Sequence, residues 1–299
     1  MSRETVPEPN PGPGSPIART PGRRSGKAGA ALAALSVALV LAMLGTLLAG
    51  PALYRAGVLD IDAATWGVAS VAWPLALLAV AVSAVALGWS AVGKRSRGVI
   101  VAIVTMTTAL LVGFRIYSYR LQHEALPPIH DVQTDWSRPV AFTTKTLQVR
   151  EQSGAAPVRD DAIIQAGAGR WAGMSFSRAQ AEAFDLKPLL VGAPPAEATV
   201  AVAEAAERLG WLVMLNDPPG GQIEAVTRSA WYGLATDAAV RVAPQGQGSR
   251  IDVRATSRTR GSDMGANARR IKLLLDDVAF ALRGSGEREP PAAKDGGAE

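Results

Sequence analysis

Residues Trp66–Val92 read WGVASVAWPLALLAVAVSAVALGWSAV, a run of apolar and small side chains without a charge. A helix needs about 20 such residues to cross the hydrocarbon core of a bilayer, and this run is long enough. Two more stretches of this kind flank it, Ala28–Gly50 and Gly98–Tyr117, with Arg115 as their only charged residue. The N-terminal part of the chain therefore predicts three transmembrane helices and an integral membrane protein.

The lysines and arginines beside these stretches indicate how the chain crosses the membrane. Residues 51–65 contain only Arg55, against two aspartates. Because cytoplasmic loops carry the excess of Lys and Arg, we expect a cytoplasmic N-terminus and, after three crossings, an extracytoplasmic C-terminal half. Arg115 and Arg120 lie on the outer flank. They are outnumbered by the cations on the inner flank, which are Arg19, Arg23, Arg24, Lys27, Lys94, Arg95 and Arg97.

Composition divides the chain into four parts. Residues 1–27 are rich in Pro, Gly, Ser and Arg and cannot bury enough apolar surface to offset the entropy of ordering, so we expect a disordered cytoplasmic tail. Residues 28–120 form the transmembrane region, residues 121–283 an extracytoplasmic domain, and residues 284–299 a second disordered tail. The domain has eighteen cations and eighteen carboxylates, so the net charge of +5 resides elsewhere. Nucleic-acid binding is not expected, because it needs a basic excess on the folded module.

Two helices and four strands are expected within the domain. Pro194-Pro195 opens a helix that stops near Gly210, and Asp263 caps a last helix with an apolar stripe. Two hairpins lie between these helices, and Arg241 is expected opposite Asp252 in the second hairpin. This order predicts an α+β domain, an antiparallel sheet with helices on one face. The strands are expected at Trp211–Asn216, Gln222–Arg228, Ala238–Ala243 and Arg250–Ser257.

Less regular sequence occupies residues 143–187. Ser177 with Gln180 resembles a capping box that starts a short helix there. The aromatic residues of the strand region are expected in the core rather than in a ligand pocket, as is typical of strands. These aromatic residues are Trp211, Trp231 and Tyr232.

Three stretches of the domain have the residues of a known family pattern. They are Pro128-Ile-His-Asp-Val-Gln-Thr-Asp135 with Pro139-Val-Ala-Phe142, then Gly210-Trp211, and then Asp252-Val-Arg-Ala-Thr-Ser-Arg258 with Ser262-Asp-Met-Gly-Ala-Asn-Ala-Arg-Arg-Ile271. On these residues the domain resembles the uncharacterised domain-of-unknown-function family 1499 over about residues 127–282. Ala255 stands where the family usually has Ser, and residues 143–180 are longer and more irregular than its common pattern. The resemblance implies a membrane-associated bacterial module of undetermined activity.

His130 and Asp131 are the most enzyme-like pair in the domain. A hydrolase could use His130 as a general base with Asp131 or Asp135. Adjacent residues in a strand point to opposite faces, however, so the polar groups of this segment are more typical of an extended entry to the sheet. No metal or cofactor is expected, because the chain has two His, no Cys and no ligand motif. An enzyme is therefore less expected than a binding module.

The stretch Arg250–Lys272 has seven cations against Asp252 and Asp263. It includes the start of the last helix, where free backbone N–H groups favour anions. An anionic ligand, such as a lipid headgroup or the acidic patch of a protein partner, is therefore one hypothesis. Internal pairing with the domain's own carboxylates is the alternative. The candidate ligand-binding residues are Arg254, Arg258, Arg260, Asp263, Asn267 and Arg270, with Asn267 also expected to bond loop carbonyls at the helix start.

Three functional hypotheses follow. The leading one is a multi-pass protein of the bacterial inner membrane that displays a binding or envelope-maintenance module outside the cytoplasm, with the lipid bilayer and an anionic group as its partners. The second is a hydrolase centred on His130. The third is a structural subunit that its spans hold in a larger membrane assembly.

Overall fold

The computed structural model describes residues 22–286, so residues 1–21 and 287–299 of the two predicted tails lie outside the described part. The chain divides into two compact units. The first unit contains Met1–Ala49 and Thr65–Phe114, and the second contains Gly50–Ala64 and Arg115–Glu299.

Three long apolar helices confirm the N-terminal prediction. They are α1 (Gly22–Arg55), α2 (Val68–Val92, preceded by a π-helical turn at Ala63–Gly67) and α3 (Ser96–Ala125). The segments long and apolar enough to cross a membrane are Lys27–Arg55, Ala63–Val92 and Ser96–Ala125, each longer than the sequence stretch that predicted it.

Small side chains line the contacts within the first unit. The Ser83 hydroxyl lies 2.9 Å from that of Thr105, which in turn donates to Ser36 over 3.4 Å. Large apolar side chains such as Leu41 and Leu111 are exposed. Small residues between helices with large ones facing outward are typical of transmembrane packing, because lipid rather than protein covers the outer surface. The buried residues of α2 are Ala72, Ala76, Ala79, Ser83, Ala86 and Ser90.

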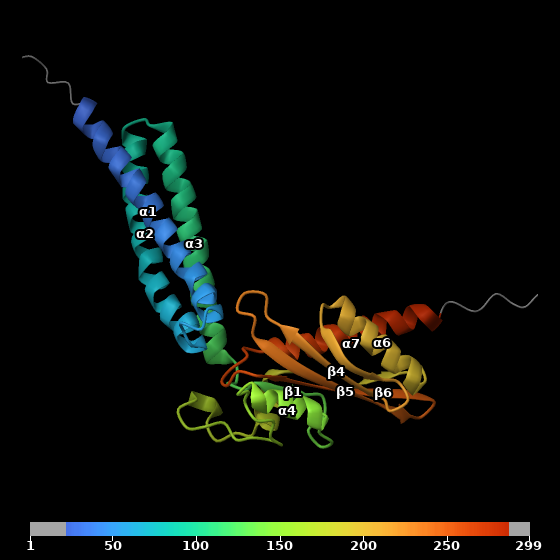
Figure 1. Cartoon of the computed structure of the whole chain (residues 1–299). Helices are drawn as coiled ribbons and strands as arrows, with labels where there is room; N and C mark the ends of the chain where they lie inside the picture. Colours follow the sequence, from blue (N-terminus) through green and yellow to red (C-terminus); the bar gives the residue numbers. More distant parts are fainter. Residues whose placement is uncertain (1–21, 287–299) are drawn as a thin grey trace, which may run out of the picture. The chain divides into compact units, whose positions relative to one another are not determined.

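The second unit contains a six-stranded antiparallel sheet (Figure 1). Five of the strands follow the order β1-β6-β5-β4-β3, and the sixth, β2, pairs with β6. The four predicted strands are present, and Arg241 lies opposite Asp252 as predicted. Two further short strands, β1 and β2, pair with the other edge of β6, at Arg254–Thr256 and at Ser249–Ile251. The strands are β1 (Asp131–Gln133), β2 (Leu189–Val191), β3 (Leu212–Asp217), β4 (Gln222–Arg228), β5 (Ala235–Gln245) and β6 (Gly248–Ser257).

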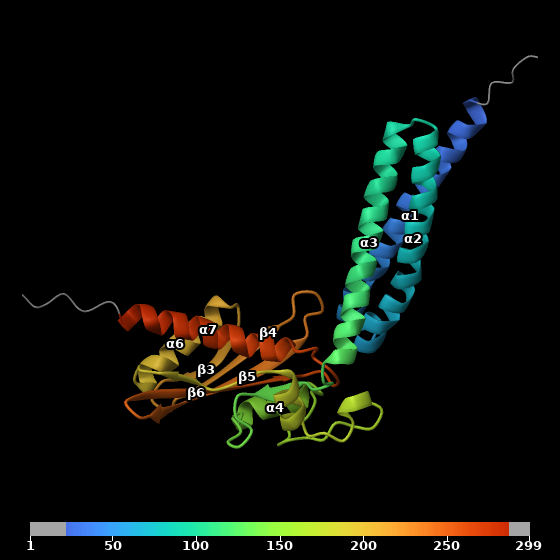
Figure 2. The same ribbon diagram turned by 180° about the vertical axis from the view of Figure 1, so that it is seen from behind.

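Helices lie on both faces of this sheet. Helices α6 (Pro195–Arg208) and α7 (Ala266–Gly286) cover one face, and α4 (Thr144–Gln152) lies on the other (Figures 1 and 2). The predicted α+β class, with helices α6 and α7 on one face of an antiparallel sheet, is confirmed, and α4 on the opposite face was not predicted. Sequence periodicity missed α4 because polar contacts hold it: the buried Glu224 carboxylate of β4 accepts hydrogen bonds from Thr143, the N-cap, and from Thr146.

The apolar core lies between the sheet and helices α6 and α7. Every second residue of β5 and β6 points into it, including Val240, Val242, Ile251 and Val253. Alternation in these two strands predicted this face correctly. Leu274 and Val278 of α7 pack against it from the helical side.

Two local predictions are wrong. The short helix α5 (Phe176–Ala183) is capped by Ser175, whose hydroxyl accepts from the Arg178 amide, and not by Ser177. Gln180 does not close a capping box. Its amide group instead bonds both backbone groups of Gln133 in β1, over 2.7 and 3.0 Å.

The aromatic prediction holds in part. Trp211 is buried in the core, whereas Trp231 is 65% exposed on the loop between β4 and β5. The loop position explains the difference, because the alternation of a strand stops at Arg228.

Candidate functional site

The face of the sheet opposite the apolar core is charged and nevertheless buried. Asp237 of β5 and Arg254 of β6 are 1% and 2% exposed. They alternate along the strands with the residues of the apolar core. Such alternation is typical of a sheet with one face in solvent, but here the charged face is buried as well. Burial of charge is costly unless each charge is paired, and the pairs can be followed one by one.

The first pair joins β6 to β1. Arg254 donates from Nε and Nη2 to the two carboxylate oxygens of Asp131, over 3.0 and 2.6 Å. Its remaining donors reach the backbone carbonyls of Val140 and Arg159. Burial raises the pKa of Asp131, and the hydrogen bonds from Arg254 oppose that rise. Arg254, a predicted ligand residue, therefore has its donors occupied within the domain.

The second cluster centres on Asp237. One of its carboxylate oxygens accepts from Arg150 of α4, and both accept from Arg258, over 2.9 and 2.7 Å. Arg150 also donates to the carbonyls of Ala156, Thr256 and Ser257. This cluster fixes α4 against the sheet and occupies Arg258, a second predicted ligand residue.

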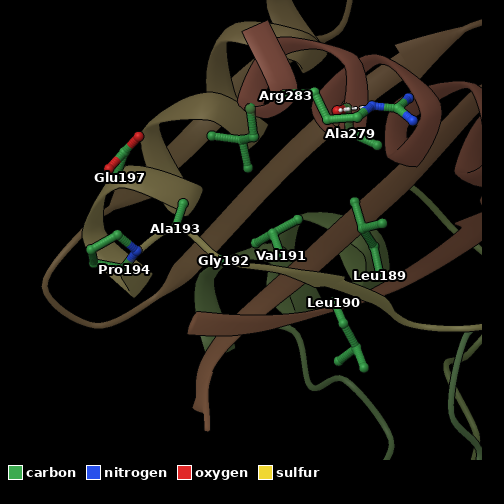
Figure 3. Close-up of a pocket in the computed structure, with 10 residues that line it drawn as sticks. Leu189, Leu190, Val191, Gly192, Ala193, Pro194, Glu197, Ala279 and Arg283 are labelled. Atoms are coloured by element: carbon green, nitrogen blue, oxygen red, sulfur yellow. Dashed lines mark hydrogen bonds between the residues drawn. The ribbon is translucent and has the colours of Figure 1, made fainter. Parts of the chain in front are cut away.

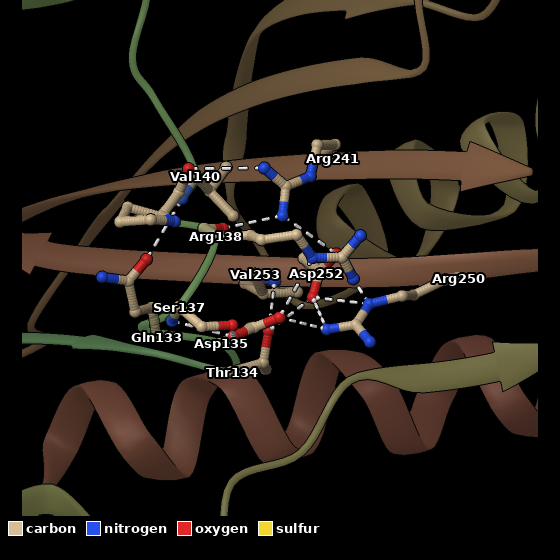
Figure 4. Close-up of polar contacts among 11 residues, drawn as sticks. Gln133, Thr134, Asp135, Ser137, Arg138, Val140, Arg241, Arg250, Asp252 and Val253 are labelled. Carbon is tan, nitrogen blue, oxygen red and sulfur yellow. Dashed lines mark hydrogen bonds and ion pairs between the residues drawn. The ribbon is translucent and has the colours of Figure 1, made fainter. Parts of the chain in front are cut away.

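The third cluster centres on Asp252. Figure 4 shows Asp252 between Arg241 and Arg250, with the shortest contacts at 3.1 and 2.9 Å. Arg250 also pairs with Asp135. Hydrogen bonding from the Ser137 hydroxyl is the main cause that lowers the pKa of Asp135 to about 2. The contacts of Asp135 are with Ser137, Arg138 and Arg250, whereas the carboxylate partner of a catalytic His130 would have to bond that histidine.

His130 and Asp131 contact different neighbours. The His130 ring packs edge-on against Phe176, with ring centroids 5.5 Å apart, whereas the Asp131 carboxylate bonds Arg254. Burial lowers the pKa of His130, and the charge of Asp131 opposes that effect. The contacts of both residues thus hold the extended segment that leads into the sheet against its neighbours.

Asp263 and Asn267 organise the start of α7. The Asp263 carboxylate accepts from the backbone amides of Gly265 and Asn267, both over 2.8 Å. Burial raises the pKa of Asp263, and these amides oppose the rise. The Asn267 amide donates to the His130 carbonyl over 3.0 Å, which is the loop contact that the sequence predicted. Because the Asp263 carboxylate already accepts from the amides of Gly265 and Asn267, fewer backbone N–H groups at this helix start remain for an anion, and side chains would have to supply most of its contacts.

Three arginines of the sequence-predicted region are placed differently from Arg254 and Arg258. Arg260 and Arg269 are exposed, and Arg270 is half-buried with a donor on Asn267 Oδ1 at 2.8 Å. Within residues 22–286, none of the three forms an ion pair with a carboxylate at contact distance, and Asp263 is the carboxylate whose charge acts on Arg269 and Arg270. Once the paired Arg250, Arg254 and Arg258 are removed, four of the seven cations remain, Lys272 and the three arginines Arg260, Arg269 and Arg270, which we call the three-arginine surface.

A groove of about 570 Å³ lies at the other end of α7 (Figure 3). Side chains of β2, Leu189 and Val191 among them, line it, together with the start of α6 and the end of α7. Glu197 and Arg283 are the charged residues among those that line it. Arg283 and Arg270 are thirteen residues apart in α7, about 20 Å along the helix. The groove is therefore separate from the three-arginine surface.

Sequence reasoning missed Arg150 and Asp237, the residues that carry the central buried cluster. No short motif marks them, because they are 87 positions apart. The signal in the sequence is the alternation of charged and apolar residues in β5 and β6. This alternation predicts a charged face and an apolar face of the sheet, but it does not predict that both faces are buried. Among residues 22–286, no group of three His, Asp or Glu side chains converges as metal ligands.

Known proteins resemble the chain in its C-terminal domain. A family model described as "Protein of unknown function (DUF1499)" matches residues 131–278, from the start of β1 to within α7. A comparison with curated proteins found no match to the chain. The matched range excludes the three apolar helices and covers the whole sheet. Residues 131–278 of the chain therefore belong to the DUF1499 family.

Proposed function

We propose that this integral membrane protein uses its C-terminal domain as a binding module for anionic groups and displays it outside the cytoplasm, on the inner membrane. The observation that carries the proposal is the three-arginine surface at the start of α7. Arg260 and Arg269 are exposed and flank Asp263 in the sequence, and the half-buried Arg270 follows them. Guanidinium groups bind phosphate and carboxylate oxygens with paired donors, which makes these groups the favoured ligand chemistry.

The remaining arginines of the region support this choice by exclusion. Arg254 and Arg258 neutralise Asp131 and Asp237 in the interior, so they serve the fold. A ligand that needed them would have to break buried ion pairs, at a cost that a surface site avoids. The proposed site therefore retains Arg260 and Arg270 of the sequence prediction and adds Arg269.

Charge reversal at the exposed members tests the anion site. In the detergent-solubilised full chain, Arg260→Glu with Arg269→Glu should weaken binding of a short-chain phosphatidylglycerol by about tenfold or more, because two charge-assisted contacts become repulsive. Binding is measured by titration calorimetry, with short-chain phosphatidylcholine as the zwitterionic comparison. Arg178→Glu with Lys187→Glu makes the same charge change at exposed positions and should leave affinity unchanged. Equal affinity in both double variants would remove the site from consideration.

The orientation has its own test. A fluorescent reporter that matures only in the cytosol should be dark when fused after Arg283, because three crossings place that position outside. The same reporter fused after Lys94, behind two crossings, should fluoresce. Fluorescence at Arg283 would reverse the proposed orientation, whatever the result of the lipid titration.

A further inference from the structure

The loop between β4 and β5, residues 229–234, is held by its own hydrogen bonds. The Ser229 amide donates to the Leu234 carbonyl, and the Gly233 amide to the Ser229 carbonyl, both over 2.9 Å. The Ser229 hydroxyl accepts from the Leu234 amide over 3.0 Å. A loop closed in this way has a defined shape, so the 65% exposure of Trp231 at its tip is a property of the fold.

The residues on either side of Trp231 contact the segment Gly50–Ala64, which belongs to the same compact unit. Arg55 donates to the Ala230 carbonyl over 2.6 Å, and the Tyr232 hydroxyl donates to the Ala64 carbonyl over 3.1 Å. The Tyr232 ring also lies edge-on to Tyr54, with centroids 6.0 Å apart. Both neighbours of Trp231 are therefore held to this segment.

Those contacts are with the ends of two membrane segments. Arg55 is the last residue of Lys27–Arg55, and Ala64 is the second residue of Ala63–Val92. Ala230 and Tyr232 are thus bonded to residues at the ends of segments long and apolar enough to cross a membrane. Trp231 lies between them, about 3.8 Å along the chain from each.

We propose that Trp231 is an interfacial anchor that inserts its indole among the lipid headgroups beside Arg55 and Ala64. Tryptophan is enriched at this depth because its ring is apolar while its N–H group can still bond water or headgroup oxygens. A large aromatic side chain on a rigid loop at the bilayer surface gains burial there without ordering a flexible segment. The anchor fixes the β4–β5 loop of the domain at the membrane surface. It does not depend on which side of the membrane the domain occupies.

The absence of cysteine makes the depth measurable at one position. Trp231→Cys in the full chain, labelled with a nitroxide and placed in phosphatidylcholine nanodiscs, should be several-fold more accessible to oxygen relative to a water-soluble nickel chelate than a label at Phe280→Cys. Phe280 is 77% exposed on α7 of the same domain and serves as the aqueous reference. Leu41→Cys, on the exposed face of α1, gives the value for the hydrocarbon interior.

The native side chain is tested by fluorescence. The native chain should lose more emission to brominated phosphatidylcholine than Trp231→Phe does, and the emission lost in Trp231→Phe should be quenched only weakly by aqueous iodide. Equal oxygen-to-nickel ratios at positions 231 and 280 would overturn the anchor. A label at 231 that is shielded from both reagents would overturn it as well, since it would indicate a protein contact in place of lipid.

Discussion

Replacing Asp237 by alanine is expected to lower the free energy of unfolding of the C-terminal domain by about 3–5 kcal/mol. The substitution leaves Arg150 and Arg258 with no carboxylate, and the Arg150 guanidinium is buried between α4 and the sheet. An unpaired charge in the interior costs far more than the pair contributed, because its hydration is lost without compensation. For a domain of this size the loss corresponds to roughly 6–20 °C in melting temperature.

The measurement is thermal unfolding of the full chain in detergent, followed by tryptophan fluorescence. Asp277→Ala is the matched control, because Asp277 also bonds an arginine, Arg208, over 2.6 Å, but on the surface. Exposed pairs contribute little, so this control should shift the melting temperature by a small fraction of the Asp237 effect. If the two variants melt together, the buried cluster does not stabilise the domain.

Arg254→Met is expected to produce a loss of similar size, about 3–5 kcal/mol. It removes both hydrogen bonds to the buried Asp131 carboxylate and leaves the Val140 and Arg159 carbonyls without this donor. The double variant Arg254→Met with Asp131→Leu should be more stable than Arg254→Met alone, since no charge is then left behind in the interior.

This double-mutant cycle separates two roles for Arg254. If the arginine serves the fold, the double variant recovers stability and binds phosphatidylglycerol with unchanged affinity. A double variant that is stable but has lost affinity would return Arg254 to the ligand site. Failure of Asp131→Leu to improve on the single variant would show that the lost carbonyl contacts, rather than the ion pair, dominate the cost.

Local patterns predicted much of the fold. The hairpin of β5 and β6 joins neighbouring segments, and its alternation determines which residues face the core, so the Arg241–Asp252 pairing could be read directly. The three apolar helices could also be predicted, because the length and hydropathy of a segment do not depend on residues far away in the sequence. Helix α6 starts at the predicted proline pair.

The remaining elements could not be predicted for a shared physical reason. Strands β1 and β2 are three residues each, too short for a period to emerge, and they form because β6 offers an open edge. Helix α4 has no apolar stripe and is held through Arg150 and Glu224. Stability that comes from buried polar partners far apart in sequence leaves no periodic trace.

The candidate site shows the same limit. Counting charges along Arg250–Lys272 identified seven cations, but the count could not tell Arg254, whose partner precedes it by 123 residues, from Arg260 on the surface. Internal pairing describes Arg250, Arg254 and Arg258. The proposed anion site rests on three of the other four cations, Arg260, Arg269 and Arg270.

The pairing of β1 with β6 has a consequence for biosynthesis. Asp131 leaves the ribosome 123 residues ahead of Arg254, and at about 5–20 residues per second this is a delay of roughly 6–25 s. Strands β3 to β6 can pair through hairpins as soon as each is made, whereas the earliest segment of the domain must wait for the last strand. Assembly of this domain can thus follow translation from β3 to β6, and it returns to β1 only after β6 has been made.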